Sequence, residues 1–239
     1  MGLISAKGNE AVESASKQAV DLKEAMIRLK DGESVKVRLL GTEDYVEYVA
    51  VADFNLGVYT QPSREGLGEK DYFVEAGKLA DSGAEGVDEK FKTLYPKKRY
   101  LIAMADVTTG KLRAWDASKS QFNNFVAQLE DYKELIADGD EAVFTFKRSG
   151  NKTDTTYSLQ YVPKPKAAEL DGFHKFDGEE VSVDFFESLL QPRTAKLQVS
   201  VLKEKGFPVD VYFPEVDLSD ETETVGTAAD DSVTPIDSI

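Results

Sequence analysis

The sequence predicts a mostly β fold with several helices, organised around one small barrel. Two features predict it: segments with the period of β-strands, and one amphipathic helix between them. Short segments that alternate apolar and polar residues, rich in Val, Tyr and Phe, occur on both sides of one amphipathic helix. The 239 residues can bury a hydrophobic core, and the absence of Cys means that no disulfide supports it. We therefore expect the fold to depend on strands that pack against that helix.

The N-terminal part begins with a helix-like pattern and then changes to strands. Across residues 9–30, apolar residues recur at spacings of three and four, which predicts an N-terminal helical segment within residues 1–30. Residues 33–40 and 44–52 have period two, as in β-strands. The residues between them predict a turn, or a bulge within one long strand.

A long irregular stretch follows these strands. Residues 61–96 contain five Gly and two Pro, so we interpret them as an insertion with short helices near 71–80 and 87–94. Long irregular stretches inside a compact domain are often functional.

Regular structure returns after the insertion. Residues 97–116 predict a hairpin of two strands around a Thr-Thr-Gly turn. Ser118 then begins an amphipathic helix whose apolar stripe continues to Ile136. Two more strands are predicted at 142–147 and 155–162.

This order of elements predicts a five-stranded Greek-key barrel of the oligonucleotide/oligosaccharide-binding (OB) type. In that fold one helix lies between the third and fourth strands, as in the predicted domain at residues 31–165. An α+β sandwich is the alternative. A helical extension at 166–206, with helices at 181–190 and 194–205, follows a Pro-Lys-Pro boundary. Residues 207–239 predict an acidic tail that is disordered toward its end.

Acidic residues are concentrated in the last third of the chain. The formal net charge is -15. Residues 1–168 carry 24 Lys and Arg and 27 Asp and Glu, a balance of -3, whereas residues 169–239 carry 5 and 17, a balance of -12. A nearly neutral domain with an acidic tail can still bind nucleic acid through a local basic surface.

Basic and aromatic residues on the predicted strands indicate such a surface. In the hairpin, alternation places Lys111, Arg113 and Trp115 on one face, where cations would contact phosphates and the indole would stack on bases. The alternative is a solvent face on which Trp115 covers the barrel rim. The predicted DNA-binding residues are Lys36, Arg38, Tyr48, Lys97, Lys98, Arg99, Lys111, Arg113, Trp115, Lys147, Arg148 and Lys152.

The sequence contains no recognisable catalytic motif. It lacks the P-loop and the dinucleotide-binding glycine pattern, and without Cys and with one His it offers no thiolate or multi-His metal site. We expect no enzyme, no cofactor and no metal, although a Mg-dependent nuclease built from scattered carboxylates stays open. The sequence also has no run of 18 apolar residues and no signal peptide, so we expect a cytoplasmic protein that is not bound to membranes.

Two stretches of the barrel region resemble single-stranded DNA-binding proteins of tailed bacteriophages. They are YPKKRYLIAMADVTTGKLRAWDASKSQFNNFV and FTFKRSGNKTDTTYSL, and the resemblance covers roughly residues 30–165. It implies an OB-type barrel that coats and protects single strands, without sequence preference, during phage DNA replication, recombination or repair in the host cytoplasm. Self-association along DNA is possible. The T-even phage version holds a structural zinc ion in its insertion, which this chain cannot do in the same way because it has no Cys.

The resemblance also implies a role for the acidic tail, which would recruit replication or recombination proteins and compete with DNA for the basic groove. The residues that would do so are Glu215, Asp217, Asp220, Glu221, Glu223, Asp230, Asp231 and Asp237. The main alternative is a replication adaptor that uses an OB-like barrel for protein interactions and does not bind DNA.

Overall fold

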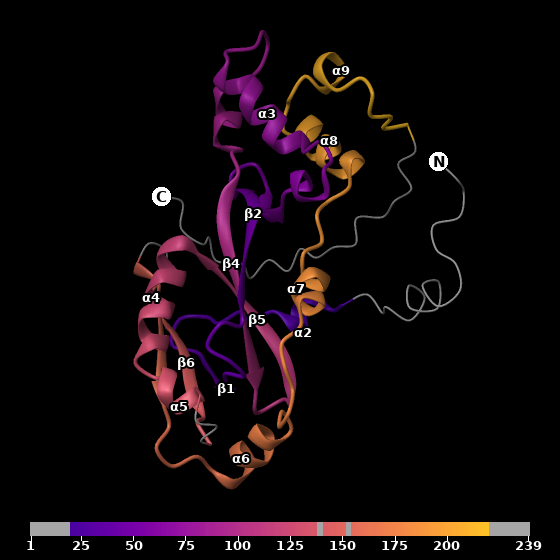
Figure 1. Ribbon diagram of the computed structural model, residues 1–239. Helices are drawn as coiled ribbons and strands as arrows, with labels where there is room; N and C mark the ends of the chain where they lie inside the picture. The colour runs from indigo at the N-terminus through magenta and orange to yellow at the C-terminus, as the bar shows by residue number, and fades with distance from the viewer. Residues whose placement is uncertain (1–19, 138–140, 152–153, 220–239) are drawn as a thin grey trace, which may run out of the picture.

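The computed structural model describes residues 20–137, 141–151 and 154–219. It confirms a mostly β protein with helices, in which an antiparallel sheet curls into a half-barrel (Figure 1). The strands are β1 (Ser34–Arg38), β2 (Tyr45–Asp53), β3 (Val58–Pro62), β4 (Lys97–Asp106), β5 (Lys111–Ser118), β6 (Phe144–Ser149) and β7 (Thr156–Tyr161). The helices are α2 (Leu22–Ala25), α3 (Tyr72–Asp81), α4 (Lys119–Glu130), α5 (Lys133–Ala137), α6 (Ala167–His174), α7 (Val183–Leu189), α8 (Ala195–Glu204) and α9 (Val209–Tyr212), with 3-10 turns η1 (Arg64–Leu67) and η2 (Glu89–Thr93).

The strand β4 organises the sheet. One of its edges pairs first with β2, over Lys97–Ile102, and then with β1, at Ala105 and Asp106. The other edge pairs with β5. On its far side β1 pairs with β6, and β6 pairs with β7. Because β4 passes from one partner to the next along its length, the sheet changes direction there and curls around its core.

The chain forms two lobes (Figure 1). The lower lobe contains the curled sheet and α4, and its core lies between them. Val37, Phe144 and Phe146 are fully buried there, and Phe125 from α4 packs among them. The predicted amphipathic helix is confirmed, and Ser118 begins it with a capping box. The helix is interrupted after Glu130, and its last turns form the separate helix α5.

The segment before β1 corrects one prediction. Residues 26–30 continue no helix: Met26 forms a parallel bridge with Ala114, and the Ile27 N–H donates to the Ala114 carbonyl over 2.7 Å. Ile27 is buried in the lower core. The apolar spacing therefore reflected a chain that lies along β5, and only α2 is helical among the described residues of this segment. The rest of the predicted helix lies outside the described residues.

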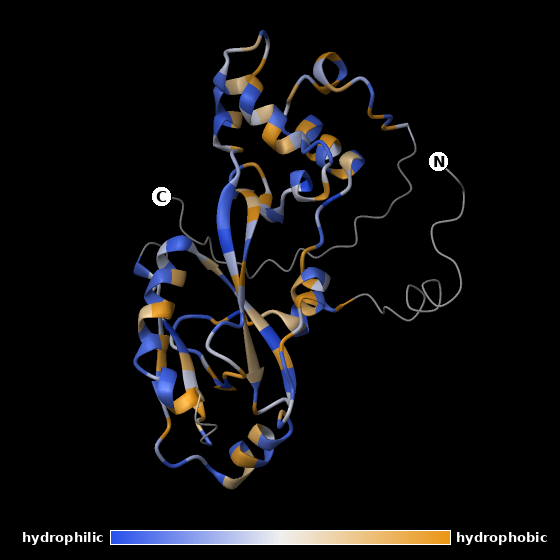
Figure 2. Cartoon of the chain, viewed as in Figure 1, coloured by the Kyte–Doolittle hydropathy of each residue, from blue (hydrophilic) through white to orange (hydrophobic). Residues whose placement is uncertain are grey.

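The upper lobe has a hydrophobic core of its own, and hydrophobic residues occur throughout both lobes (Figure 2). The insertion supplies Phe73 and Phe91, and the C-terminal extension supplies Leu202. Phe207, the first residue of the predicted acidic tail, is also buried in this core. The helices expected near 71–80 and 87–94 correspond to α3 and η2. The insertion and the extension thus pack together although they are far apart in sequence. They lie beside the C-terminal end of β2 and the N-terminal end of β4 (Figure 1).

The helix α7 joins the lobes. Its Phe186 and Leu189 are buried against Leu101, Ala103 and Ala114, on the face of the sheet opposite to α4. The extension therefore covers the outer face of β4 and β5. Among the described helices, none has the length and apolar character needed to cross a membrane.

Close backbone contacts at two helical glycines give a test of this packing. A Cβ on Gly172 of α6 would lie 1.8 Å from the Val107 carbonyl oxygen, and one on Gly77 of α3 would lie 2.3 Å from that of Leu94. Helix propensity alone favours Ala over Gly by about 1 kcal/mol, but overpacking costs about 1–3 kcal/mol. We expect Gly172→Ala to lower the free energy of unfolding in urea. Gly66→Ala, which meets nothing within 4 Å, is the control; equal stability of Gly172→Ala and the wild type would contradict the packing.

Candidate nucleic-acid interface

The β2–β3 hairpin carries two exposed aromatic side chains. Phe54 is 51% and Tyr59 is 42% exposed, and their rings meet edge to face with centroids 5.6 Å apart. The neighbouring Leu56 and Val58 are buried in the upper core, which anchors the hairpin. We call Phe54 and Tyr59 the hairpin platform. A rigid, exposed aromatic pair is the kind of surface on which unpaired bases stack.

Two cations from the C-terminal extension lie beside this hairpin. Arg193, between α7 and α8, is half-buried; burial lowers its pKa, and the phenol of Tyr59 is close enough to oppose that shift. The side chain of Lys205 lies against Gly57, within 3.6 Å of where a Cβ would be. Neither cation pairs with a carboxylate of any described residue. Both are therefore available to an anion, and neither was predicted from the sequence as a DNA contact.

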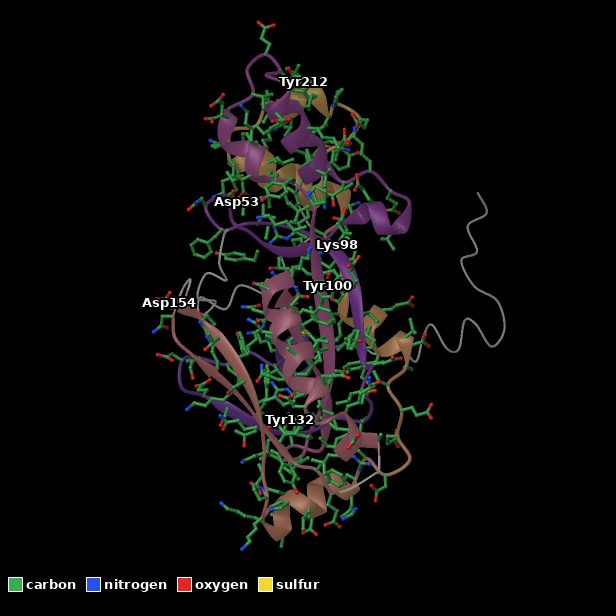
Figure 3. The ribbon with its side chains drawn as sticks, turned by 60° about the vertical axis from the view of Figure 1, so that its left-hand side comes forward. Asp53, Lys98, Tyr100, Tyr132, Asp154 and Tyr212 are labelled. Carbon is green, nitrogen blue, oxygen red and sulfur yellow. The ribbon has the colours of Figure 1, made fainter. Side chains whose placement is uncertain are left out.

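Another exposed aromatic residue lies just before β4. Tyr95 is 52% exposed, and the Lys97 ammonium lies 4.5 Å from its ring centroid. Lys98 instead pairs with Glu47 at 2.8 Å, and this contact lowers the pKa of Glu47. Figure 3 shows Asp53, at the end of β2, and Lys98 at the level where the two lobes meet. Of the DNA contacts predicted at the start of β4, Lys97 therefore lies beside an exposed aromatic ring, whereas Lys98 forms an ion pair with an acid.

Trp115 lies in the core and not on the surface that was predicted to bind DNA. Its side chain is 3% exposed and packs against Phe125, Phe146 and Tyr157 in the lower core. The predicted stacking of Trp115 on bases is therefore wrong for this conformation. Alternation correctly grouped the residues of β5 by face, but the face that carries Trp115 is the inner one.

Tyr48 and Arg99 form an internal network with Asp116. The Arg99 guanidinium donates to both carboxylate oxygens of Asp116 at 2.9–3.1 Å, and the Tyr48 hydroxyl donates to the same carboxylate at 3.0 Å. Burial and the charge of Asp116 raise the pKa of Tyr48 well above its usual value. Both side chains are engaged within the fold, which corrects their prediction as free DNA contacts.

The other cations of the hairpin also have partners. Arg113 pairs with the buried Asp106 at 3.0 Å and donates to the Met26 carbonyl at 2.9 Å. Lys111 pairs with Glu24 at the surface. Arg113 therefore holds the segment before β1 against β5, a structural role that its prediction as a phosphate contact did not include.

The two predicted cations at the end of β6, Lys147 and Arg148, differ in their surroundings. Arg148 is 6% exposed and donates to the Leu29 carbonyl at 2.8 Å and to Thr155, so its prediction as an exposed DNA contact is wrong. Lys147, its neighbour, is half-buried and forms no ion pair with a described residue. Lys152 lies outside the described residues.

On β1, the two predicted cations have different surroundings. The Lys36 ammonium bonds to the Thr145 hydroxyl at 2.6 Å and has no acid partner in the described ranges. Arg38 pairs with Asp177 at 2.6 Å and stacks over the Phe173 ring at 4.0 Å, so α6 covers it. Lys36 and Lys147 thus stay accessible on the outer face of the lower sheet, and Arg38 does not.

The beginning of the acidic tail is attached to the upper lobe. Glu215 pairs with Lys70 at 2.7 Å and accepts from the Tyr72 hydroxyl at 3.4 Å, and Lys70 lowers the pKa of Glu215. A hydrogen bond to Ser219 lowers the pKa of Asp217. Phe213, just before them, is buried. The other predicted tail residues lie outside the described residues: Asp220, Glu221, Glu223, Asp230, Asp231 and Asp237.

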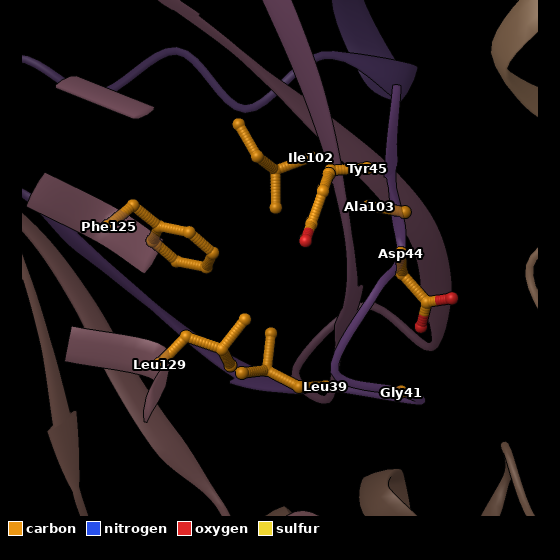
Figure 4. Close-up of a pocket in the computed structure, with 8 residues that line it drawn as sticks. All are labelled: Leu39, Gly41, Asp44, Tyr45, Ile102, Ala103, Phe125 and Leu129. Atoms are coloured by element: carbon orange, nitrogen blue, oxygen red, sulfur yellow. The ribbon is translucent and has the colours of Figure 1, made fainter. Parts of the chain in front are cut away.

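Two small cavities lie at the bend between β1 and β2. One of about 10 Å³ lies at the bend between β1 and β2, beside Ile102 and Phe125 (Figure 4), and another of about 60 Å³ lies next to it. Neither has the few hundred Å³ that a small-molecule site usually needs. Asp44 borders the first cavity, with its carboxylate directed away from the apolar wall; burial raises its pKa. Across the described ranges, no three His, Asp or Glu side chains are grouped so that they could hold a metal ion.

The single His of the chain forms a bridge at the end of the lower lobe. His174 contacts Asp177 through Nδ1 at 2.9 Å and Glu141 through Nε2 at 3.1 Å, and Asp177 also binds Arg38. Only the doubly protonated ring can donate to both carboxylates. The two acids accordingly raise the pKa of His174 above its ordinary value of 6.5.

This bridge predicts a pH dependence. The stabilisation by His174 is fully present below the unfolded pKa and is lost as the pH rises through the higher folded pKa. Because the chain has one His, its NMR titration needs no assignment. We expect a folded pKa above 6.5 that falls toward the ordinary value in Asp177→Asn. A folded pKa at or below that of the unfolded chain would contradict the bridge.

No protein-family model and no curated protein matches the chain. The relationship to phage single-strand-binding proteins therefore stays a prediction from the two stretches quoted above.

Proposed function

We propose that this protein binds single-stranded DNA without strong sequence preference, as a non-catalytic component of phage DNA replication, recombination or repair. The observation that carries the proposal is the hairpin platform, an exposed and anchored aromatic pair. Beside it lie two cations that have no acid partner within the described ranges. Aromatic rings stack on any base, and cations contact the phosphates. This combination therefore favours binding of a single strand whatever its base sequence.

The strand pairing supports an OB-like barrel. When β1 and β2 are counted as one interrupted first strand, that strand pairs with the second (β4) and the fourth (β6). The third strand, β5, pairs with β4, and the fifth, β7, pairs with β6. Barrels of this type bind oligonucleotides with the loop between the first two strands. Here that connection begins with the hairpin platform.

The charge distribution is compatible with this role despite the net charge of -15. Arg193 lies near Tyr59, Lys97 lies beside Tyr95, and Lys205 lies against Gly57 of the same hairpin. None of the three has an acid partner among the described residues. We propose that these cations replace the paired residues Arg99, Arg113 and Arg148 as the phosphate contacts, while Lys36 and Lys147 offer a second, weaker basic surface.

Fluorescence anisotropy of a labelled oligo-dT tests the proposal. We expect binding to the single strand that weakens as salt rises, because phosphate contacts release counterions, and little binding to a duplex of equal length. Incubation with Mg²⁺ should leave the oligonucleotide intact, whereas its degradation would favour a nuclease. Absence of binding at low salt, both for the full chain and for a chain that ends at residue 219, would refute the proposal and favour the adaptor.

A further inference from the structure

We propose that Arg64 is a positioning residue, which holds the backbone of Arg193 so that the Arg193 guanidinium can bind a DNA phosphate next to the hairpin platform. The C-terminal extension, for which the sequence indicated no role, then contributes directly to the DNA site. The inference rests on the proposed function.

Arg64 connects the insertion to the extension. Its Nη1 donates to the Arg193 carbonyl at 2.9 Å, across 129 positions of sequence, and its Nη2 pairs with Glu69. The Arg64 side chain is 15% exposed. A largely buried arginine that binds two partners loses most of its freedom, so the carbonyl that it binds is held in place.

The position of Arg64 is in turn fixed by the start of α3. The buried Asp71 accepts from the backbone N–H of Arg64 at 2.9 Å and also caps α3 through Phe73 and Val74. A second link joins α3 to α8: Gln198 accepts from the Tyr72 N–H at 2.9 Å. Arg193 lies just before α8. Arg193 and Gln198 are therefore both anchored to the insertion, which follows directly after the hairpin that carries the platform.

The surroundings of Arg193 indicate an anionic ligand. Its guanidinium is half-buried near Tyr59 and has no carboxylate partner in the part of the chain that the structure describes. Partial burial of an unpaired charge is unfavourable, and an incoming anion relieves it. Guanidinium groups bind phosphate oxygens in bidentate fashion. A phosphodiester attached to a base that stacks on Tyr59 meets both requirements.

Salt titrations of full-length variants test this arrangement. Arg193→Ala should weaken oligo-dT binding roughly tenfold and reduce the slope of log K against log salt by about 1, the loss of one phosphate contact. Arg64→Met keeps the aliphatic stem but removes the donors, and it should reduce the slope by a similar amount. In the double variant the two effects should not add, because both act through the same guanidinium.

Two controls separate this inference from the proposed function. Lys203→Ala removes a cation of α8 that already pairs with Asp210, so its salt slope should equal that of the wild type. Thermal melting of Arg64→Met shows whether the variant stays folded, and Arg193→Ala tests the phosphate contact independently. An unchanged slope in Arg193→Ala, with normal wild-type binding, would overturn this inference alone. Additive effects in the double variant would overturn the positioning role. No binding by the wild type would overturn the proposed function itself.

Discussion

Replacing both Phe54 and Tyr59 with Ala is expected to weaken binding of single-stranded DNA by about 2–6 kcal/mol, since each stacked base contributes about 1–3 kcal/mol. The two rings touch each other, so the loss in the double variant need not equal the sum of the single losses. Because both side chains are about half exposed, the free energy of unfolding should change little.

The measurement is oligo-dT anisotropy at fixed salt, with unfolding in urea recorded for every variant. Val211→Ala, on the exposed surface of α9, is the matched control and should bind like the wild type. An abasic oligonucleotide of the same length separates stacking from charge: the wild type should bind it about as weakly as the double variant binds oligo-dT. Wild-type affinity in the double variant would remove the hairpin platform from the DNA site.

Strands and the main helix could be predicted from the sequence because their signals are local. Period two in the segments around Val37 and Phe146 identified strands whose apolar residues are indeed buried, and Ser118 correctly marked the start of α4. The strand β3 was not predicted, since it has only five residues and ends with a Pro, which weakens the pattern. Of the helix expected before Asp31, residues 26–30 are not helical, because apolar spacing does not distinguish a short helix from a chain packed along a strand.

The site was harder to predict because its parts come from distant segments. Arg193 and Lys205 reach the β2–β3 hairpin only through the shared core of the upper lobe, and no sequence pattern connects them to Tyr59. Ion pairs also join distant segments: Asp177 pairs with Arg38, which lies 139 positions earlier in the chain. Sequence alone therefore overestimated the number of free cations in the barrel and overlooked those of the extension.

The prediction for Trp115 was wrong for a related reason. Alternation assigns residues to two faces of a strand but does not say which face is covered. Because Lys111 and Arg113 share the face of Trp115, that face was interpreted as solvent. In the structure Arg113 reaches Asp106 at the end of the sheet, while Trp115 enters the core beneath α4.

Trp115→Ala should therefore destabilise the protein by about 3–5 kcal/mol, as expected when a large aromatic residue is removed from a core. Such a loss is a large part of the 5–15 kcal/mol that usually stabilises a domain, so much of the variant should be unfolded at moderate urea. Trp115→Phe keeps a ring against Phe125 and Phe146, and its loss should be clearly smaller.

Binding by Trp115→Phe then distinguishes a core role from a DNA contact. A ring that is 3% exposed cannot reach a base, so oligo-dT affinity should equal that of the wild type, and the fluorescence of wild-type Trp115 should not be quenched directly by the strand. A loss of affinity in Trp115→Phe with unchanged stability would mean that β5 turns its inner face outward when DNA binds. Destabilisation with unchanged affinity would place base stacking elsewhere, and the exposed rings with cations beside them are on the β2–β3 hairpin.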